Sequence, residues 1–191
     1  MKQFIVLIAA ISLLLSGCGG YSISEDELNQ ALAKKLAKPI SNTLKVSQGE
    51  EVIALTMQVS AGDLALSSDQ GGLLRLTLET QLTGTLSLFS RDFALTSQIT
   101  PVLETGIRLD QDKLYLVGPK IVRLKVEGAG FQDQMLMSVL PSIQGDIEIA
   151  IKAYFNENAL YQLDHSLLEK WVAKFASEIS IKQANLELRV L

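Results

Sequence analysis

Residues 74–88 read Leu-Arg-Leu-Thr-Leu-Glu-Thr-Gln-Leu-Thr-Gly-Thr-Leu-Ser-Leu. Six of the eight even positions are leucine, and every odd position is polar or charged. Because successive side chains of a β-strand point to opposite faces, this alternation predicts one strand with an apolar face and a polar face. At about 3.3 Å per residue the strand would span on the order of 50 Å, whereas ordinary strands contain roughly 3–10 residues.

The same period of two continues on both sides of this stretch. Gly62 separates an odd-numbered from an even-numbered apolar series, which predicts a β-bulge. A polar turn is expected at 110–112. Consecutive strands with short polar connections favour an antiparallel meander over parallel βαβ units. The other strands of the meander are expected at 53–59, 64–66, 93–103, 107–109, 114–117 and 121–126.

Helical patterns lie before and after the meander. Ser24 and Glu27 have the spacing of a capping box, and apolar residues at helical spacing follow them until Pro39. Apolar residues then recur every four positions over 131–154, which predicts a long helix. Pro141 lies inside this pattern and should kink or divide the helix.

A third helix is expected after Ser166, where Glu169 completes a second capping-box spacing. Residues 185–191 alternate again and predict a final strand, which could return to the sheet. We therefore predict a single α+β domain over 24–191, in which a long curved antiparallel meander wraps the long helix of the C-terminal half. The third helix carries the apolar residues Leu167, Leu168, Trp171, Val172 and Phe175.

The N-terminus carries a targeting signal. Lys2, the apolar run 4–15 and small residues before Cys18 describe a secretory signal peptide, and the four residues that end at Cys18 resemble the bacterial lipobox. We therefore predict a signal peptide at 1–17, acylation of Cys18 and a lipidated tether at 18–23. The alternatives are an ordinary signal peptide with a chance cysteine, or a transmembrane anchor, which needs about 20 apolar residues.

The residues after Cys18 and the net charge indicate where the domain resides. No aspartate follows Cys18 directly, which favours the outer membrane of a Gram-negative host over the inner membrane, with the domain facing the periplasm. Removal of Lys2 with the signal peptide changes the formal net charge from −4 to −5. An acidic surface does not attract nucleic acid, so we expect no nucleic-acid partner and expect membrane attachment through the lipids alone.

The numbers of cysteine and histidine residues exclude several common types of enzyme active site. Cys18 is the only cysteine and His165 the only histidine, which excludes multi-histidine metal sites and a Cys–His pair. No G-x-S-x-G elbow accompanies His165, which we interpret as a surface or capping residue. We predict a non-enzymatic protein without catalytic residues, metal or cofactor, and a hydrolase is the most distant alternative.

The long apolar strand face suggests a different kind of site. A curved sheet around a long helix encloses an elongated apolar core, and separation of the two would open a groove suited to an acyl chain. A core filled by its own side chains is the alternative interpretation. Pro141 is the position at which we expect a mobile gate. The candidate lining residues are Leu74, Leu76, Leu78, Leu82, Leu86 and Leu88 of the strand and Met135, Val139, Ile143 and Ile147 of the helix.

Several stretches resemble the YceB-like family of bacterial lipoproteins. Cys18 followed by Tyr21–Leu32 resembles the start of the mature chain in that family, and further similar stretches fit in order and spacing over nearly the whole mature chain. The match is weakest at 49–68. The further stretches are Thr100-Pro101-Val102, Leu140-Pro141, Tyr154-Phe155-Asn156 and Ala159–Leu163.

The resemblance implies a fold but no mapped binding motif. The family has no assigned function, and its fold is similar to one module of the tubular lipid-binding (TULIP) proteins, in which a curved antiparallel sheet surrounds a long helix and an apolar channel. The resulting hypothesis is an anchored lipoprotein that binds a lipid or another elongated apolar ligand. The alternative is a tethered scaffold that binds an envelope protein and holds no ligand. An exposed apolar patch or long unpaired strand edges would favour the scaffold.

Overall fold

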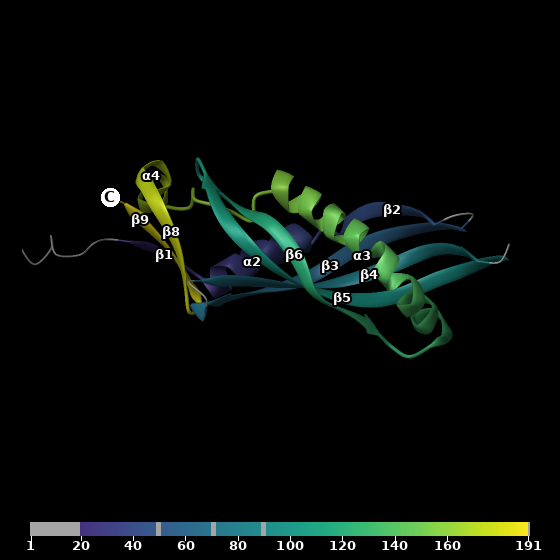
Figure 1. Cartoon of the computed structure of the whole chain (residues 1–191). Helices are drawn as coiled ribbons and strands as arrows, with labels where there is room; N and C mark the ends of the chain where they lie inside the picture. Colours follow the sequence, from purple (N-terminus) through teal and green to yellow (C-terminus); the bar gives the residue numbers. More distant parts are fainter. Residues whose placement is uncertain (1–19, 49–50, 70–71, 89–90, 191) are drawn as a thin grey trace, which may run out of the picture.

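The computed structural model describes residues 20–48, 51–69, 72–88 and 91–190. The described chain forms an elongated molecule whose long strands run along most of its length (Figure 1). The expected signal peptide and Cys18 lie outside these residues.

Six strands form the main sheet, in the order β2-β3-β4-β5-β6-β7, and all neighbours are antiparallel. The first five follow one another along the chain, so the predicted meander is confirmed. The stretch that begins at Leu74 lies in β4, which has 16 residues. The strands are β2 (Ile40–Gln48), β3 (Glu51–Ser67), β4 (Leu73–Leu88), β5 (Arg91–Asp110), β6 (Lys113–Glu127) and β7 (Tyr161–Gln162).

Bulges join segments that the sequence pattern separated. The phase change expected near Gly62 occurs inside β3, where the register with β4 shifts between Val59 and Ala61. The pairing of β5 with β6 shifts twice, between Val102 and Leu103 and again before Gly106. Each bulge bends its strand and increases the local twist, so a few long bent strands replace a larger number of short ones.

Both ends of the domain meet in a second sheet, with three strands in the order β1-β9-β8 (Figure 1). The expectation that the tether extends to residue 23 is therefore wrong, and the last strand does not return to the main sheet. Ile23 lies opposite Leu186 across β1 and β9, and both side chains are fully buried. The strands are β1 (Tyr21–Ser24), β8 (Ala176–Lys182) and β9 (Asn185–Val190).

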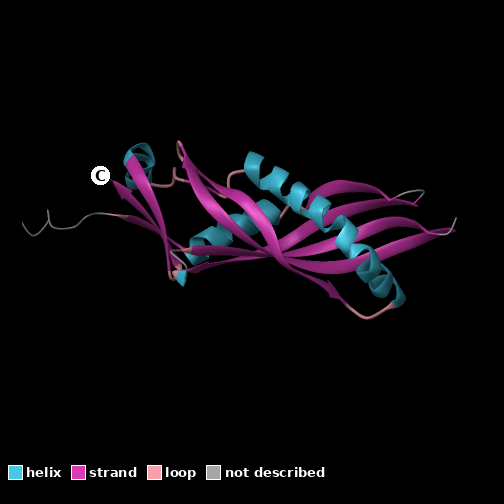
Figure 2. Ribbon diagram, viewed as in Figure 1, coloured by secondary structure: helices cyan, strands magenta, loops and turns pink. Residues whose placement is uncertain are grey.

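The long helix α3 (Phe131–Glu157) crosses one face of the main sheet (Figure 2). It is helical through Pro141, which does not divide it. It has its most extensive contact with β6, followed by β2 and β5. The sheet thus curves around the helix, with β3 and β4 set further back, and the predicted α+β class and wrapped arrangement are confirmed.

The first helix α2 (Glu25–Leu36) covers the other half of the sheet. Its predicted capping box is confirmed, because the Ser24 side chain accepts from the Glu27 amide and the Glu27 carboxylate accepts from the Ser24 amide. Beyond residue 59 β3 has no β2 partner. There the Asn29 amide takes the place of a neighbouring strand, donating to the Leu64 carbonyl at 2.8 Å and accepting from its N–H at 2.7 Å.

The third helix α4 (Leu167–Phe175) begins as predicted after Ser166, whose hydroxyl accepts from the Glu169 amide at 3.1 Å. The second half of the expected capping box is wrong. The Glu169 carboxylate accepts from the backbone N–H of His165 at 2.6 Å and is only 2% exposed. It turns toward the body of the protein because other buried donors compete for it there.

Candidate functional site

The apolar zone between α3 and the inner face of the sheet is the candidate ligand site, and we call it the seam. On the sheet side, residues of β3, β4 and β5 that share this face are at most 2% exposed. On the helix side, residues of successive turns complete the same continuous core. The buried residues that define the seam are Leu55, Met57, Leu82, Leu95 and Ile99 of the sheet and Leu136, Ile143 and Ile147 of α3.

Several of the residues expected from sequence lie in this seam. Leu82, Ile143 and Ile147 are fully buried in it, whereas Met135 and Val139 are partly buried and pack against the core. Leu86 and Leu88 belong to the distal part of β4, but their side chains lie outside the described part of the structure.

The other strand candidates lie under α2. In the register of β3 and β4, Leu74, Leu76 and Leu78 pair with the part of β3 that α2 covers. A Cβ placed on Gly62 would lie 2.9 Å from a methyl of Leu78 and 3.2 Å from a methyl of Leu36, so these two leucines meet there. The apolar face of β4 is therefore shared between two helices and does not run entirely along α3.

Burial changes along α3. In the C-terminal half, Ile147, Ile151 and Phe155 are at most 2% exposed. In the N-terminal half, before Pro141, Leu136 alone is buried by the same standard, and three further apolar side chains are only partly covered. Pro141 lacks the N–H of a normal helical residue, so it marks a weaker point of backbone bonding between the halves.

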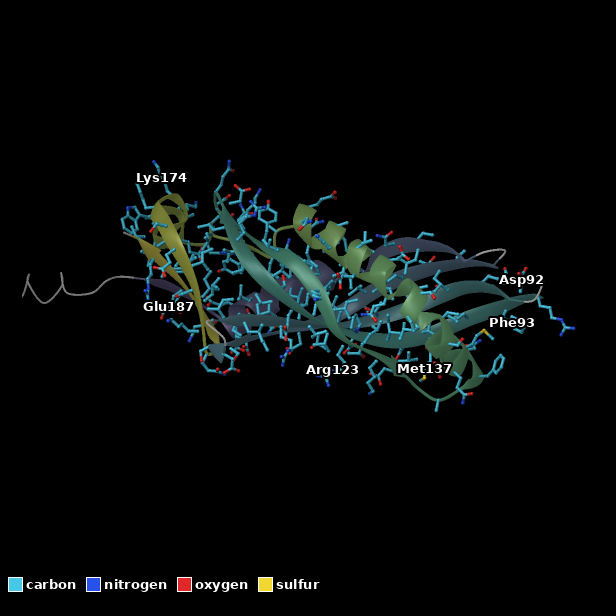
Figure 3. All side chains as sticks on the ribbon, in the orientation of Figure 1. Asp92, Phe93, Arg123, Met137, Lys174 and Glu187 are labelled. Carbon is cyan, nitrogen blue, oxygen red and sulfur yellow. The ribbon has the colours of Figure 1, made fainter. Side chains whose placement is uncertain are left out.

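The partly covered part of α3 opens toward the far end of the sheet. Met137 in this part of the helix is 45% exposed. Figure 3 shows Met137 at the same end of the molecule as Asp92 and Phe93. We call this end the distal mouth, because the apolar side chains of α3 that pack against the sheet here are only partly covered. Its residues on α3 are Met135, Met137, Val139 and Leu140.

Two polar groups interrupt the apolar inner face. Ser97 of β5 is buried and donates to the Asp133 carboxylate at 2.6 Å, which fastens the first turn of α3 to the sheet. Thr80 of β4 is 3% exposed, and its hydroxyl is the one buried side-chain polar atom without a hydrogen-bond partner in the described residues. It lies between Leu78, on the α2 side, and Leu82 in the seam. A hydroxyl buried in this way is free to bond a polar group of a ligand.

A polar hollow lies away from the seam. Its volume is about 970 Å³, and it lies between α2, the β6–β7 edge and the start of α4. Lys34, Lys35 and Lys113 line it together with carboxylates that include Glu169. Its open, charged walls differ from the apolar lining needed by an acyl chain, so we do not assign it to the predicted ligand.

Glu169 organises the wall of this hollow. Tyr21 donates to its Oε1 at 2.7 Å and Tyr161 donates to the same oxygen at 2.9 Å. Burial alone would raise the pKa of Glu169, but the hydrogen bonds from Tyr21, Tyr161 and the His165 amide lower that pKa below its usual value. Burial, followed by the contact with Glu169, raises the pKa of both tyrosines. The carboxylate therefore ties β1, β7 and α4 together as an anion.

His165 occupies the capping region of α4, as the sequence interpretation placed it. Its ring Nδ1 lies 3.2 Å from Glu169 Oε2, and its side chain is 64% exposed. Sequence reasoning missed the role of Glu169, since a capping box explained the Ser166–Glu169 spacing fully. Across the described residues no group of three or more His, Cys, Asp and Glu side chains is arranged to hold a metal ion. No helix in the same residues is long and apolar enough to cross a membrane.

The chain belongs to the family described as "Protein of unknown function (DUF1439)", which matches residues 23–185. This agrees with the resemblance of the sequence to a lipoprotein family without assigned function. No curated protein matches the chain.

Among solved structures, one described as "Crystal structure of lipopolysaccharide binding protein" is similar over 88% of this chain and 48% of that chain. The sequence identity is 13% and the TM-score is 0.37. This chain thus spans about half the length of that protein.

Proposed function

We propose that this protein binds a lipid or another elongated apolar ligand in the seam between α3 and the main sheet. The observation that carries the proposal is the change in burial along α3. The helix is fully packed near Phe155 but only partly covered at Met135 and Val139, where the seam opens at the distal mouth.

The chemistry of the seam suits an acyl chain. Its walls are leucine, isoleucine, valine and methionine, and transfer of a methylene group from water into such surroundings is worth about 0.8 kcal/mol. Met135 and Met137 of the mouth have flexible, polarisable side chains that adapt to irregular apolar partners. Deeper in the seam, the unpaired Thr80 hydroxyl can bond an ester or carboxyl oxygen.

The lipobox expected at Cys18 is the basis for a proposal about where the domain is located. We propose that acylation of Cys18 anchors the domain to the periplasmic face of the outer membrane. A Cys18→Ser variant should lack the acyl mass and should leave the membrane fraction after cell breakage, whereas the wild-type chain stays with outer-membrane markers. Retention of Cys18→Ser in that fraction would contradict the anchor.

Ligand binding can be tested on the mature protein extracted from its own envelope in mild detergent. Native mass spectrometry separates the covalent anchor, which is part of the protein mass, from a non-covalent lipid. We expect a stoichiometric lipid adduct in the wild type. Val139→Trp should reduce this adduct by filling the mouth. Ile149→Trp is the matched control, because Ile149 is an apolar residue of the same helix that is 65% exposed.

The outcomes separate the two function hypotheses. A wild-type protein without adduct, and without a mass shift when phospholipid or fatty acid is added, would refute the ligand site and favour the protein-binding scaffold. Equal loss of lipid in both tryptophan variants would show that the seam is not where the lipid binds.

A further inference from the structure

The helix α4 presents an apolar face to the outside of the molecule. Leu167 is 88% exposed, and Leu168, Trp171 and Phe175 are each about half exposed. At 100° per residue these four side chains lie within one arc of about 100° on the helix surface. Glu169 lies on the opposite side of the helix and Val172 borders the arc, and both are buried in the domain. The packing of α4 therefore leaves its most apolar face about half exposed or more.

The side chains of this face are of the kinds found in helices that lie at a bilayer interface. The rings of Trp171 and Phe175 are in contact, with centroids 5.4 Å apart, and the Lys174 ammonium lies 5.5 Å from the Phe175 centroid. Lys170 and Lys174 are exposed and flank the apolar arc on one side, although the chain as a whole has a net charge of −4. Leucine and aromatic side chains beside snorkelling lysines are typical of helices that lie in the headgroup region.

The position of α4 relative to the chain start points to the same surface. Tyr21 begins β1 and bonds Glu169 of α4 at 2.7 Å. The proposed lipid attachment site, Cys18, precedes Tyr21 by three residues, which span at most about 11 Å. Figure 1 shows α4, β1 and the C-terminus together at one end of the molecule, opposite the distal tips of β3–β5. A bilayer that holds the acyl chains of Cys18 therefore lies within reach of α4.

We propose that α4 lies in the interface of the leaflet that holds the lipid anchor. Leu167, Leu168, Trp171 and Phe175 insert among the upper acyl segments, and Lys170 and Lys174 contact the phosphates of anionic phospholipid. This inference rests on the proposed anchoring at Cys18. It gives the domain a defined orientation, in which the Glu169 hydrogen bonds couple α4 to the first residues after the anchor and the distal mouth points away from the anchoring membrane.

Trp171 is the only tryptophan of the chain and reports on this contact directly. The mature lipidated protein is reconstituted into vesicles of phosphatidylethanolamine and phosphatidylglycerol, with or without lipids brominated on the acyl chains. We expect a blue shift of the emission relative to the protein in water, a severalfold fall in acrylamide quenching, and strong quenching by the brominated lipids. Vesicle flotation measures the anchor separately.

Two variants at exposed apolar positions provide a matched comparison. Leu168→Glu should restore acrylamide quenching of Trp171 while the protein still floats with the vesicles. Ile149→Glu, on the outer face of α3, should leave the lipid contact of Trp171 intact. Circular dichroism and unfolding midpoints confirm that both variants fold.

The readouts distinguish the possible failures. Protein that floats with the vesicles while Trp171 stays exposed to acrylamide and insensitive to brominated lipid would overturn the α4 contact and leave the anchor standing. If Trp171 is exposed in vesicles but protected in intact envelopes, the face binds a protein and the bilayer proposal is refuted. Absence of flotation together with an unmodified Cys18 would refute the anchor itself.

Discussion

The two halves of the main sheet share the same strands and the same apolar alternation, but they are covered differently. In one half, Leu28, Leu32 and Leu36 of α2 are at most 2% exposed, and Asn29 satisfies the open edge of β3. In the other half, Met135 and Val139 in the first half of α3 are only partly buried. The comparison teaches that alternation identifies an apolar face without telling how tightly another element closes over it.

The largest expected difference between the two halves follows from removal of a similar side-chain volume from each. Leu76→Ala in the α2 half should lower the free energy of unfolding by about 3–4 kcal/mol, because it leaves a cavity in a closed core. Met135→Ala in the α3 half should lower it by only about 1 kcal/mol, because the side chain is already partly exposed. Urea unfolding of both purified variants measures the difference. Equal losses would show that the two halves are equally closed.

The polar cluster beside the α2 half gives the next largest effect. Glu169→Gln should lower the free energy of unfolding at neutral pH by about 2 kcal/mol, because the amide replaces an anion that accepts from Tyr21, Tyr161 and the His165 amide. Asp164→Asn is a suitable control, since that carboxylate is exposed. If Glu169→Gln lowers the free energy of unfolding no more than Asp164→Asn does, the hydrogen bonds to Glu169 do not stabilise the fold.

The same residue predicts a pH dependence. The folded-state pKa of Glu169 is lowered, so its contribution to stability is fully present above the unfolded value of about 4.3 and is lost as the pH falls through the folded value. The difference in unfolding free energy between wild type and Glu169→Gln should therefore shrink as the pH is lowered below about 4.3. A difference that stays constant in acid would show that the carboxylate does not titrate with unfolding.

A substitution with a smaller expected effect tests whether Asn29 closes the open edge of β3. Asn29→Ala should cost about 1 kcal/mol, since it removes two hydrogen bonds to the Leu64 backbone while the alanine improves helix propensity. Gln30→Ala, at an exposed neighbouring position, should be nearly neutral. Hydrogen exchange at the Leu64 amide should accelerate in Asn29→Ala only, and unchanged exchange there would contradict the proposed edge closure.

The smallest effect sharpens the assignment of the seam. Thr80→Val removes a buried hydroxyl without a partner and keeps the side-chain shape, so it should raise the free energy of unfolding of the ligand-free protein by about 1 kcal/mol. It should also weaken binding of a lipid whose polar group bonds that hydroxyl. An unchanged lipid adduct would place the polar end of the ligand elsewhere.

Sequence patterns predicted the elements whose signals are local. The capping box at Ser24, the long alternation in β4 and the four-residue repeat of α3 each depend on residues within a few turns or along one strand, and all three are confirmed. The strands β1 and β7 were missed because they have four and two residues, too few to show a period. The strands β2 and β8 were missed as well, although they have nine and seven residues. Glu169 was misread because its strongest partners include Tyr21, which is 148 positions away.

In the candidate site, too, some features follow from local sequence and others depend on distant segments. The periodicity of the chain by itself determined that β4 and α3 each present an apolar face, because side-chain direction follows from backbone geometry. The tertiary structure alone decided that Leu74, Leu76 and Leu78 pack under α2 while Leu82 faces the seam, and that the apolar face of α4 stays uncovered. Burial depends on which elements meet in space, and that outcome is set by the summed packing of distant segments.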